Sequence, residues 1–436
     1  MTQLGGAVMK CSIKQGASAL VALALALTLV AACGDDDNGG TKATPTEPAK
    51  TEVVSTSKPA EDVVITIASL TDLTGASAVA LQPIEAALDD LVKYYNEEHL
   101  ISGVELKAIR YDTRYEPSKY IGGYEWLKEK GADLLFSPVP GAAEIIRPRL
   151  EEDGMLLFSP SALKGHLIPP GNIFMAATIP EDNAYTLLKW LAENDEDFPK
   201  DRPARIGGAG WSTPYNMALH DAMEEYVKAH PDQYEWKGKY QTDLGFTWGP
   251  QVEALKDCDY VMVPIVLNNF VKEFRAAGHT AKFIGTAAQA GFMGLISDAG
   301  LWEEVDGMIF LGMVAWWGDG SEEAAFMEEI LYRYRAGQAQ EIIRSGSGYG
   351  AVDAINQMIE IIADAVEAVG PDNFDSEALY EAAISYTQTR NSGEVRASFS
   401  ETKRASLDRL PVYEADGAAK DLLMVSDGLV PLIREP

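Results

Sequence analysis

The sequence predicts an α/β fold built from two Rossmann-like lobes. Strand-like and helix-like segments alternate along residues 63–312 with short breaks between them, the pattern of parallel sheets covered by helices. The alternation occurs as two consecutive sets of similar kind, and no repeat of fixed period is present. Hydrophobic residues make up 47% of the 436 residues, which is sufficient to bury a sizeable core in each lobe.

The first set begins with residues 63–70 (VVITIASL), a β-branched run that predicts a buried strand. Leu81, Leu88 and Leu91 then recur at helical spacing, so a long amphipathic helix is expected to about Glu97. The elements expected after it are strand 104–111, helix 117–130, strand 134–136, helix 142–153 and strand 155–158.

The second set follows a short strand at 173–177 and keeps the same alternation. Its expected elements are helix 182–194, strand 205–210, helix 214–229, strand 234–240, helix 250–256, strand 260–263, helix 269–277, strand 283–285 and strand 307–312. Two long helices, at 322–336 and 349–369, are expected next. The tail from 395 to 433 alternates like short strands joined by turns, with strands expected at 410–414 and 422–425.

The charge and cysteine content exclude several classes of protein. The chain has 66 Asp and Glu against 36 Lys and Arg, a net charge of −30, which disfavours binding to nucleic acid or to anionic lipid. Three cysteines, Cys11, Cys33 and Cys258, are too few for a disulfide framework or a four-cysteine zinc site.

The N-terminus has the features of an export signal. Lys10 and Lys14 precede an apolar run at 17–30 that is too short to span a bilayer comfortably. Residues 29–33 (LVAAC) resemble a bacterial lipobox, in which the cysteine, here Cys33, receives a diacylglyceryl group and becomes the new N-terminus. A plain signal peptide with an incidental cysteine is the alternative.

A flexible tether is expected after the predicted lipidated cysteine. Residues 34–62 contain three prolines, many Ser and Thr, and almost no large apolar side chain, a composition typical of an extended, unfolded linker. The expected organisation is therefore a signal peptide at 1–32, the lipidated Cys33 with its tether at 33–62, and a folded body from Val63.

The sequence contains no catalytic or metal-binding signature. A nucleophile elbow, an HExxH motif, a P-loop and paired CxxC motifs are all missing from it. Two glycine clusters, 208–213 and 346–351, imitate a dinucleotide fingerprint, but each lacks part of the required pattern and is interpreted as a loop or helix start. Neighbouring acids disfavour a reactive thiolate at Cys258. No enzyme activity and no cofactor are expected.

A series of short stretches carries a family resemblance across nearly the whole body. They are 67–75 (IASLTDLTG), Asp112, 135–137 (LFS), 157–160 (LFSP), 173–178 (IFMAAT), 307–309 (GMI) and 349–354 (YGAVDA). In this order and spacing they resemble the branched-chain amino-acid class of ABC-transporter substrate-binding proteins. The resemblance implies a type 1 periplasmic-binding fold, in which three segments cross between the lobes. It also implies lobes formed by 63–177 with 313–394 and by 178–312 with 395–436.

The residues that hold an amino acid in that family are only partly matched here. Loops that supply hydroxyl and N–H donors in the family contain Pro138, Pro140 and Pro160 instead, and proline has no N–H to donate. Leu163 replaces an expected hydroxyl, and no carboxylate stands at 285–288 to pair with an ammonium group. Ala80 falls near the position of an expected aromatic residue. A standard α-amino acid is therefore a doubtful ligand.

Hydroxyl and aromatic side chains are expected to line the cleft, because ligands of open α/β sheets lie at the carboxyl ends of the strands. The candidates in the first lobe are Thr71, Thr74, Ser137, Val139, Ser159 and Ser161. Those beyond it are Trp211, Tyr215, Asn268, Thr286, Gln289 and either Trp316 or Trp317. A turn or helix-cap role is the alternative for each hydroxyl, and core packing is the alternative for each tryptophan.

These features predict an extracytoplasmic solute-binding lipoprotein of an ABC importer. It is expected to capture a small organic solute, with an apolar or aromatic body and a polar end, by hinge closure, and to deliver it to a membrane permease. The body is expected to be monomeric, lipid-anchored at the cell membrane and facing the periplasm or cell exterior. A ligand-sensing receptor that regulates a membrane partner is the alternative function, and an enzyme on a Rossmann-like body is a third.

Overall fold

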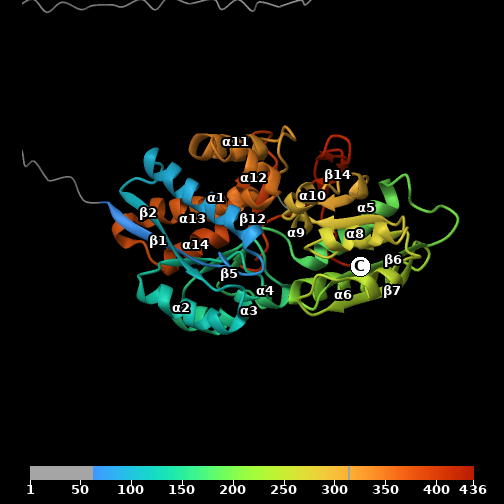
Figure 1. Ribbon diagram of the computed structural model, residues 1–436. Coiled ribbons are helices and arrows are strands. Elements are labelled where there is room, and N and C mark those ends of the chain that lie inside the picture. The colour runs from blue at the N-terminus through green and yellow to red at the C-terminus, as the bar shows by residue number, and fades with distance from the viewer. Residues whose placement is uncertain (1–61, 313–314) are drawn as a thin grey trace, which may run out of the picture. The chain divides into compact units, whose positions relative to one another are not determined.

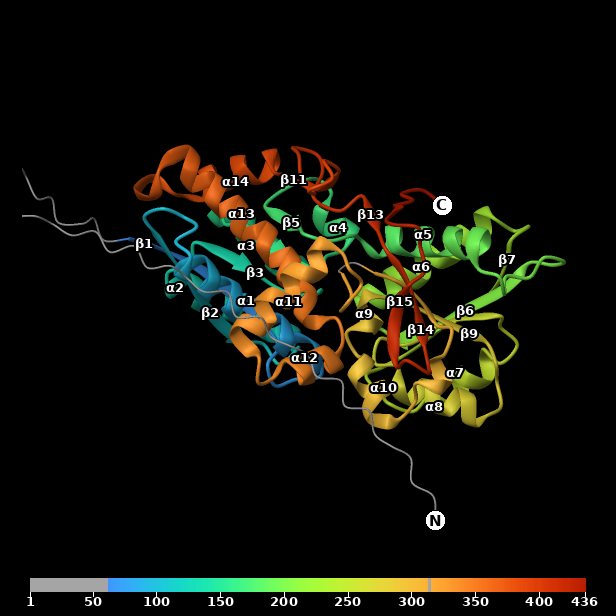
Figure 2. The ribbon, with the colours of Figure 1, turned by 90° about the horizontal axis from the view of Figure 1, so that it is seen from above.

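The structure is a computed structural model that describes residues 62–312 and 315–436 (Figure 1). The predicted signal peptide, Cys33 and nearly all of the predicted tether lie outside the described residues. The described chain forms two α/β lobes, each built on its own sheet, which confirms the predicted fold class (Figure 2). The lobe boundaries expected at 177, 312 and 394 stay a prediction.

The first lobe is built on a parallel sheet whose inner strands are buried on both sides. Its strands are β1 (Val63–Thr71), β2 (Val104–Asp112), β3 (Leu134–Phe136), β4 (Leu157–Ser159) and β5 (Ile173–Met175). Their order in the sheet is β2-β1-β3-β4-β5. Successive residues of β1 alternate between two cores: Ile65 and Ile67 belong to one, Ala68 and Leu70 to the other.

Helices cover both faces of this sheet (Figure 1). The elements of the first lobe are α1 (Ala78–Glu97), the 3₁₀ turn η1 (Pro117–Lys119), α2 (Tyr120–Glu129), α3 (Ala142–Asp153), α4 (Lys164–Leu167), α11 (Glu322–Arg335), α12 (Ala339–Ser345), η3 (Gly348–Ala351), α13 (Val352–Val369), η4 (Pro371–Asn373) and α14 (Ser376–Ser385). The blue α1 and orange α13 pack on one face, and α2 and α3 on the other. The sequence did not predict α4, α12 or α14.

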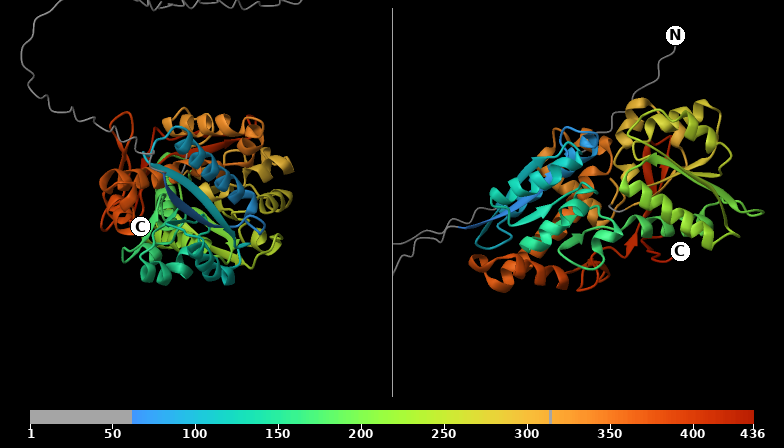
Figure 3. Two further views of the ribbon diagram at one scale, coloured as in Figure 1. Left: turned by 90° about the vertical axis from the view of Figure 1, so that its left-hand side faces the viewer. Right: turned by 90° about the horizontal axis from the view of Figure 1, so that it is seen from below.

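The second lobe has a larger, mixed sheet. Its strands are β6 (Ala204–Trp211), β7 (Tyr234–Thr242), β8 (Tyr260–Met262), β9 (Lys282–Thr286), β10 (Ile309–Leu311), β14 (Val412–Asp416) and β15 (Asp421–Met424). Their order is β15-β14-β10-β9-β8-β6-β7, with β6 to β10 parallel and the two C-terminal strands antiparallel. Figure 3 shows the red C-terminal strands in the yellow and green lobe, although the orange helices before them cover the other lobe.

Helices also cover both faces of the second sheet. They are α5 (Pro180–Asn194), α6 (Pro214–Ala229), α7 (Gly249–Ala254), α8 (Asn268–Ala276), α9 (Ala287–Ala290), α10 (Met293–Ala299) and the 3₁₀ turn η2 (Glu303–Val305). Leu188 and Leu219, from α5 and α6, share a core with Met262 of the sheet. Phe270 and Phe274 of α8 pack on the opposite face. The short helices α9 and α10 were not predicted.

The first and third crossing segments are hydrogen-bonded to each other between the lobes. The third crossing joins a hairpin of β11 (Thr387–Thr389) and β12 (Val395–Ser398) to a second small pair, β13 (Arg409–Leu410) with β16 (Val430–Pro431). The Met175 amide donates to the Arg404 carbonyl at 2.7 Å, and the Ser406 amide donates to the Met175 carbonyl at 2.9 Å. These crossings therefore form a short two-stranded ribbon between the lobes.

Glycines in β6 let the helix that follows the strand approach the sheet closely. A Cβ built on Gly208 would lie 2.6 Å from Nε2 of His220 on α6, and one on Gly210 would lie 3.1 Å from Asn216. His220 is fully buried. The glycines of the cluster at 208–213, which imitates a dinucleotide fingerprint, thus allow close packing between β6 and α6.

Replacing Gly208 by alanine is expected to lower the free energy of unfolding by about 1–3 kcal/mol, because the added methyl group would overlap the buried His220 imidazole. Urea unfolding followed by circular dichroism would measure the change. Gly249→Ala is the matched control, since its Cβ meets nothing within 4 Å. Equal effects of the two substitutions would contradict this account of the packing.

The protein should also lose stability in weak acid because of His220. Burial, and secondarily the positive charge of Lys239, lowers the pKa of His220 from 6.5 to about 4. The unfolded chain therefore binds the proton more readily, so the stabilisation is complete above pH 6.5 and is lost as the pH falls toward 4.

From about pH 7.5 to about pH 5, His220 should contribute a loss of about 2 kcal/mol in unfolding free energy. Urea unfolding at both pH values, for the natural protein and for His220→Gln, would measure this contribution. The pH-dependent loss should be smaller in the variant. An unchanged loss would assign the acid sensitivity to other groups.

Candidate functional site

A cavity of about 180 Å³ lies between the lobes, lined by residues from both of them. Most of its lining residues come from loops at the carboxyl ends of the strands and from the first turns of the helices that follow. They are Ser77, Ala80, Leu81, Ile84, Tyr115, Pro138, Pro140, Pro160, Ser161, Ala176, Ala177, Trp211, Thr213, Tyr215, Ile265, Ala287, Ala288, Gly291, Phe292, Ser347, Gly348, Ala351 and Ala354.

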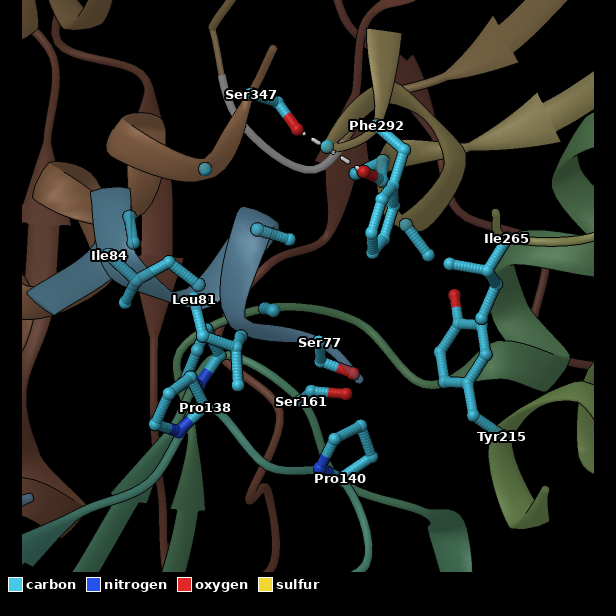
Figure 4. Close-up of a pocket in the computed structure, with 18 of the residues that line it drawn as sticks. Ser77, Leu81, Ile84, Pro138, Pro140, Ser161, Tyr215, Ile265, Phe292 and Ser347 are labelled. Atoms are coloured by element: carbon cyan, nitrogen blue, oxygen red, sulfur yellow. Dashed lines mark hydrogen bonds between the residues drawn. The ribbon is translucent and has the colours of Figure 1, made fainter. Parts of the chain in front are cut away.

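Figure 4 shows how these side chains surround the space. Leu81 and Pro138 of the first lobe stand on one side, and Tyr215, Ile265 and Phe292 of the second lobe stand on the other. The walls are therefore largely apolar. A solute held there would contact both lobes at once.

In the first lobe, two serine hydroxyls connect neighbouring strand ends. Ser137 Oγ donates to the Leu70 carbonyl, and Ser159 Oγ donates to the Ser137 carbonyl, each at 2.7 Å. The Ser161 amide in turn donates to Ser159 Oγ at 3.1 Å. The hydroxyls of Ser137 and Ser159 thus hold the two loops in place, and the loops present prolines and Ser161 to the cavity.

The turn after β1 is organised around a buried carboxylate. Asp72 is fully buried and accepts hydrogen bonds from the amides of Gly75, at 2.5 Å, and Ser77, at 2.9 Å. Thr74 Oγ1 donates to Asp112 Oδ2 at 2.6 Å, which joins this turn to the end of β2. The arrangement places Ser77 and the start of α1 at the cavity wall.

Tyr115 reaches the cavity from a backbone conformation that few residues adopt. Arg114 and Tyr115 both have left-handed φ values, of 56° and 59°. A Cβ on Gly75 would lie 2.3 Å from the Arg114 carbonyl oxygen, so the two turns pack tightly. Burial, and secondarily the charge of Asp72, raises the pKa of Tyr115, which keeps its hydroxyl protonated. Strain of this kind is concentrated at functional sites.

In the second lobe, a hydrogen-bond chain fixes the wall behind Tyr215. Its hydroxyl lies 3.2 Å from Thr286 Oγ1, and Gln289 Oε1 accepts from the Thr286 amide at 2.9 Å. Gln289 Nε2 donates to the Val263 carbonyl at 3.0 Å. Burial raises the pKa of Tyr215, so this hydroxyl is also neutral.

The aromatic rim of the second lobe is formed by Trp211 at the end of β6. Its indole N–H donates to the Gly245 carbonyl at 2.7 Å, and its ring meets Phe246 edge to face, with centroids 5.6 Å apart. Trp211 lines the cavity, whereas Phe246 is 53% exposed. The indole is thereby oriented by the loop after β7.

The lobes also touch directly beside the cavity. Ser347 Oγ donates to the Ala287 carbonyl at 3.2 Å, and the Ser347 amide donates to the Ala290 carbonyl, also at 3.2 Å. Gly346 has a φ of 120°, and a Cβ there would lie 2.3 Å from the Ala290 carbonyl oxygen. This contact requires glycine.

Of the residues proposed from the sequence, Ser161, Trp211 and Tyr215 lie together at the cavity wall. Six others are not lining residues but belong to the strand ends, turns and loops that carry the wall. Thr71 and Val139 are buried there, and Thr74, Ser137, Ser159 and Gln289 make the hydrogen bonds described above. Thr286 supports Tyr215 directly.

Three proposed residues lie elsewhere. Asn268 is the first residue of α8 and is not among the lining residues. The Trp316 indole donates to Asp421 at 2.6 Å, and its amide lies 3.1 Å from the Tyr413 hydroxyl. The Trp317 indole donates to the Gly346 carbonyl at 3.2 Å, next to the contact between the lobes.

Several lining residues did not emerge from the sequence. Tyr115, Ile265 and Phe292 follow β2, β8 and α9, so the rule that loops after strands form the site could have found the first two. Ser77 stands at the start of α1. Ser347 lies in the glycine-rich run 346–351, for which the sequence predicts only a loop or helix start.

The described residues that line the cavity carry no formal charge. Among its described lining residues there is no Asp, Glu, Lys, Arg or His, and its polar side chains are the hydroxyls of Ser77, Ser161, Thr213, Ser347 and the two tyrosines, with the Trp211 N–H. In the part of the chain that the structure describes, no group of three or more His, Cys, Asp or Glu side chains could hold a metal ion. Within 62–312 and 315–436, no helix has the length and hydropathy of a membrane span.

The sequence matches the model of a family described as periplasmic binding protein over residues 64–419. No curated protein matches the chain.

Three solved structures illustrate the likeness in fold. A branched-chain amino acid ABC transporter from Thermus thermophilus with bound valine has a TM-score of 0.72 at 18% identity, covering 85% of this chain and 97% of that one. A fatty acid ABC transporter substrate-binding protein from Thermomonospora curvata has a TM-score of 0.70 at 15% identity, covering 85% of this chain and 92% of that one. An ABC-transporter solute-binding protein from Rhodopseudomonas palustris HaA2 in complex with p-hydroxybenzoic acid has a TM-score of 0.69 at 13% identity, covering 86% of this chain and 98% of that one.

The family model covers most of the chain, and these structures share its bilobal architecture. The chain belongs to the periplasmic binding protein family.

Proposed function

We propose that this protein is the solute-capturing component of an ABC importer and that it binds a small, uncharged organic molecule between its lobes. The observation that carries the proposal is the cavity itself, whose walls come from both lobes and whose described lining residues include no ionisable acid or base other than two neutral tyrosines. The solute would have an apolar body, for the aliphatic and aromatic walls, and one polar end such as an amide or hydroxyl.

The absence of charge among the described lining residues argues against an amino acid. A buried ammonium group would lose its hydration without gaining a carboxylate partner, which costs several kcal/mol. A carboxylate would depend on N–H and O–H donors, and Pro138, Pro140 and Pro160 supply no N–H at three positions of the wall. Relatives in this fold have been solved with valine and with p-hydroxybenzoic acid. The solute proposed here resembles the apolar part of such molecules and lacks their charge.

Capture would proceed by hinge closure. The hydrogen-bonded ribbon at Met175 and Ser406 would serve as the axis about which the lobes rotate. A solute that contacts both walls would stabilise the conformation in which the walls are close, which is a shift in population. The loaded protein would then deliver the solute to a permease.

Binding should be detectable as thermal stabilisation of the full chain. Amides, alcohols and phenols with branched or aromatic bodies should raise the melting temperature by a few degrees when present well above their Kd, whereas amino acids should not. Differential scanning fluorimetry would measure this, with the intrinsic tryptophan fluorescence, to which Trp211 at the cavity wall contributes, as a second readout. If only charged solutes stabilise the protein, the proposed ligand class is wrong. If no solute of a broad panel does so, the binding function loses its support.

A pair of variants would show whether the solute binds in the cavity between the lobes. Ala288→Phe should weaken solute binding by about tenfold to a hundredfold, because the ring would fill part of the cavity. Ala276→Phe, on the exposed end of α8, is the matched control and should bind normally. Equal binding by both variants would place the solute elsewhere.

We also propose that the protein is held at the membrane by a lipid on Cys33, facing the periplasm or cell exterior. The LVAAC motif after an apolar run, followed by a polar linker, supports this proposal. A lipidated N-terminal cysteine carries at least two acyl chains, and two chains anchor stably where one does not.

Cys33→Ser should therefore move the protein from the membrane fraction to the soluble fraction without changing solute binding. Fractionation with immunoblotting and metabolic labelling with a fatty acid would measure this. Retention of the variant in the membrane would show that the cysteine is not the anchor. Recovery of a sensor protein, and no permease, in pull-downs would favour the receptor function instead.

A further inference from the structure

The polar side chains around the cavity between the lobes differ in how they are paired. On the second lobe, each of them has a partner within the wall. The Tyr215 hydroxyl lies 3.2 Å from Thr286 Oγ1. Thr213 Oγ1 accepts from Asn216 Nδ2 at 3.2 Å, and the Trp211 N–H is bonded as described above. The hydrogen-bonding capacity of this side is therefore largely used within the protein.

Three hydroxyl groups on the first lobe have no such partner. They belong to Ser77, Tyr115 and Ser161, and none of them makes a hydrogen bond to a described residue. None of their oxygens is among the described buried polar atoms without a partner, so each keeps some accessible surface. Figure 4 shows the hydroxyls of Ser77 and Ser161 directed into the space that Tyr215 bounds on its other side. Groups in this position hydrogen-bond to water or to a ligand.

Tyr115 is held at the wall by the turn that follows β2. Its amide donates to Thr113 Oγ1 at 3.3 Å, and the Thr113 hydroxyl donates to the Thr71 carbonyl at 2.8 Å, which ties the turn to the end of β1. Tyr115 keeps its left-handed φ of 59° in this arrangement. A non-glycine residue in that conformation costs free energy, which the surrounding structure must offset. The turn thus fixes a partly buried phenol ring at the cavity.

We propose that Tyr115 determines which solutes are bound, because its hydroxyl, with those of Ser77 and Ser161, hydrogen-bonds to the polar end of the solute. This inference rests on the proposed function, since it assigns a role within the same cavity. The apolar body of the solute would then face Ile265 and Phe292 of the second lobe.

The three hydroxyls also narrow the class of polar end. Burial raises the pKa of Tyr115, so its hydroxyl keeps the proton and can donate as well as accept. A primary amide matches such a group of hydroxyls well, because its carbonyl oxygen accepts two hydrogen bonds and its NH₂ group donates two. A wholly apolar solute would displace water from these hydroxyls without replacing its hydrogen bonds, and would lose affinity for that reason.

Isothermal titration calorimetry of the full chain with benzamide and with toluene tests the proposal. The two probes have the same ring and differ in the polar end, and the measured quantity is the ratio of the toluene Kd to the benzamide Kd. Tyr115→Phe should lower this ratio about tenfold, because benzamide loses a hydrogen bond in the variant and toluene loses none. Ser161→Ala should lower the ratio in the same direction, and it provides an independent test if Tyr115→Phe fails to fold.

Tyr111→Phe is the matched control and should leave the ratio unchanged. Tyr111 lies near the end of β2, outside the lining residues, and its ring packs against Trp126 with centroids 5.8 Å apart. Its hydroxyl also makes no hydrogen bond to a described residue.

The possible outcomes separate this inference from the proposed function. An unchanged ratio in Tyr115→Phe, or equal weakening of both probes, would overturn the role of Tyr115 and leave the proposed function standing. An unchanged ratio in Ser161→Ala would overturn the shared site of three hydroxyls. If the natural protein binds neither probe, the result counts against the proposed ligand class, and the role of Tyr115 falls with it.

Discussion

The arrangement of the two lobes depends on a few backbone hydrogen bonds between crossing segments. The bonds that Met175 makes with Arg404 and Ser406 join the last strand of the first sheet to the chain that returns to the second lobe. These bonds are between backbone groups, and they hold the two crossings side by side. The cavity walls come from loops on both sheets. The site therefore depends on how the two lobes are joined as much as on its own side chains.

The cavity between the lobes and the ion pairs at the start of α11 differ in how they handle polar groups. Behind the cavity between the lobes, the hydroxyls of Ser137 and Ser159 donate to backbone carbonyl groups and hold the loops that form its wall. Its interior is apolar and uncharged, which favours ligands that lose little hydration on entering. At the start of α11, by contrast, Glu323 lies 2.7 Å from Arg390 and 2.5 Å from Arg396, so charge is balanced within the protein in a buried setting, where salt screens it least.

Much of the fold follows from the sequence because buried parallel strands and amphipathic helices have distinct periodicities. All ten strands expected between residues 63 and 312 are present, within a few residues at their ends. Short elements such as α9 carry too few residues to show a period. Helix α14 had a usable signal, because Asp375 caps it by accepting from the Ala378 amide at 2.9 Å. At the site, strand-end loops could be identified from the sequence, but the direction of each hydroxyl could not. Ser137 turns toward a neighbouring strand, and only tertiary packing decides this.

The contact at Gly346 has a consequence for how tightly any solute is held. The lobes meet there through hydrogen bonds from Ser347 to two carbonyl groups, all between uncharged partners. Each bond contributes to the free energy of separating the lobes, whether or not a solute is present. The apparent dissociation constant measured for a solute includes the fraction of molecules whose lobes are apart and can admit it. Residues that never touch the solute can therefore set its affinity, and this part of the affinity should respond little to ionic strength.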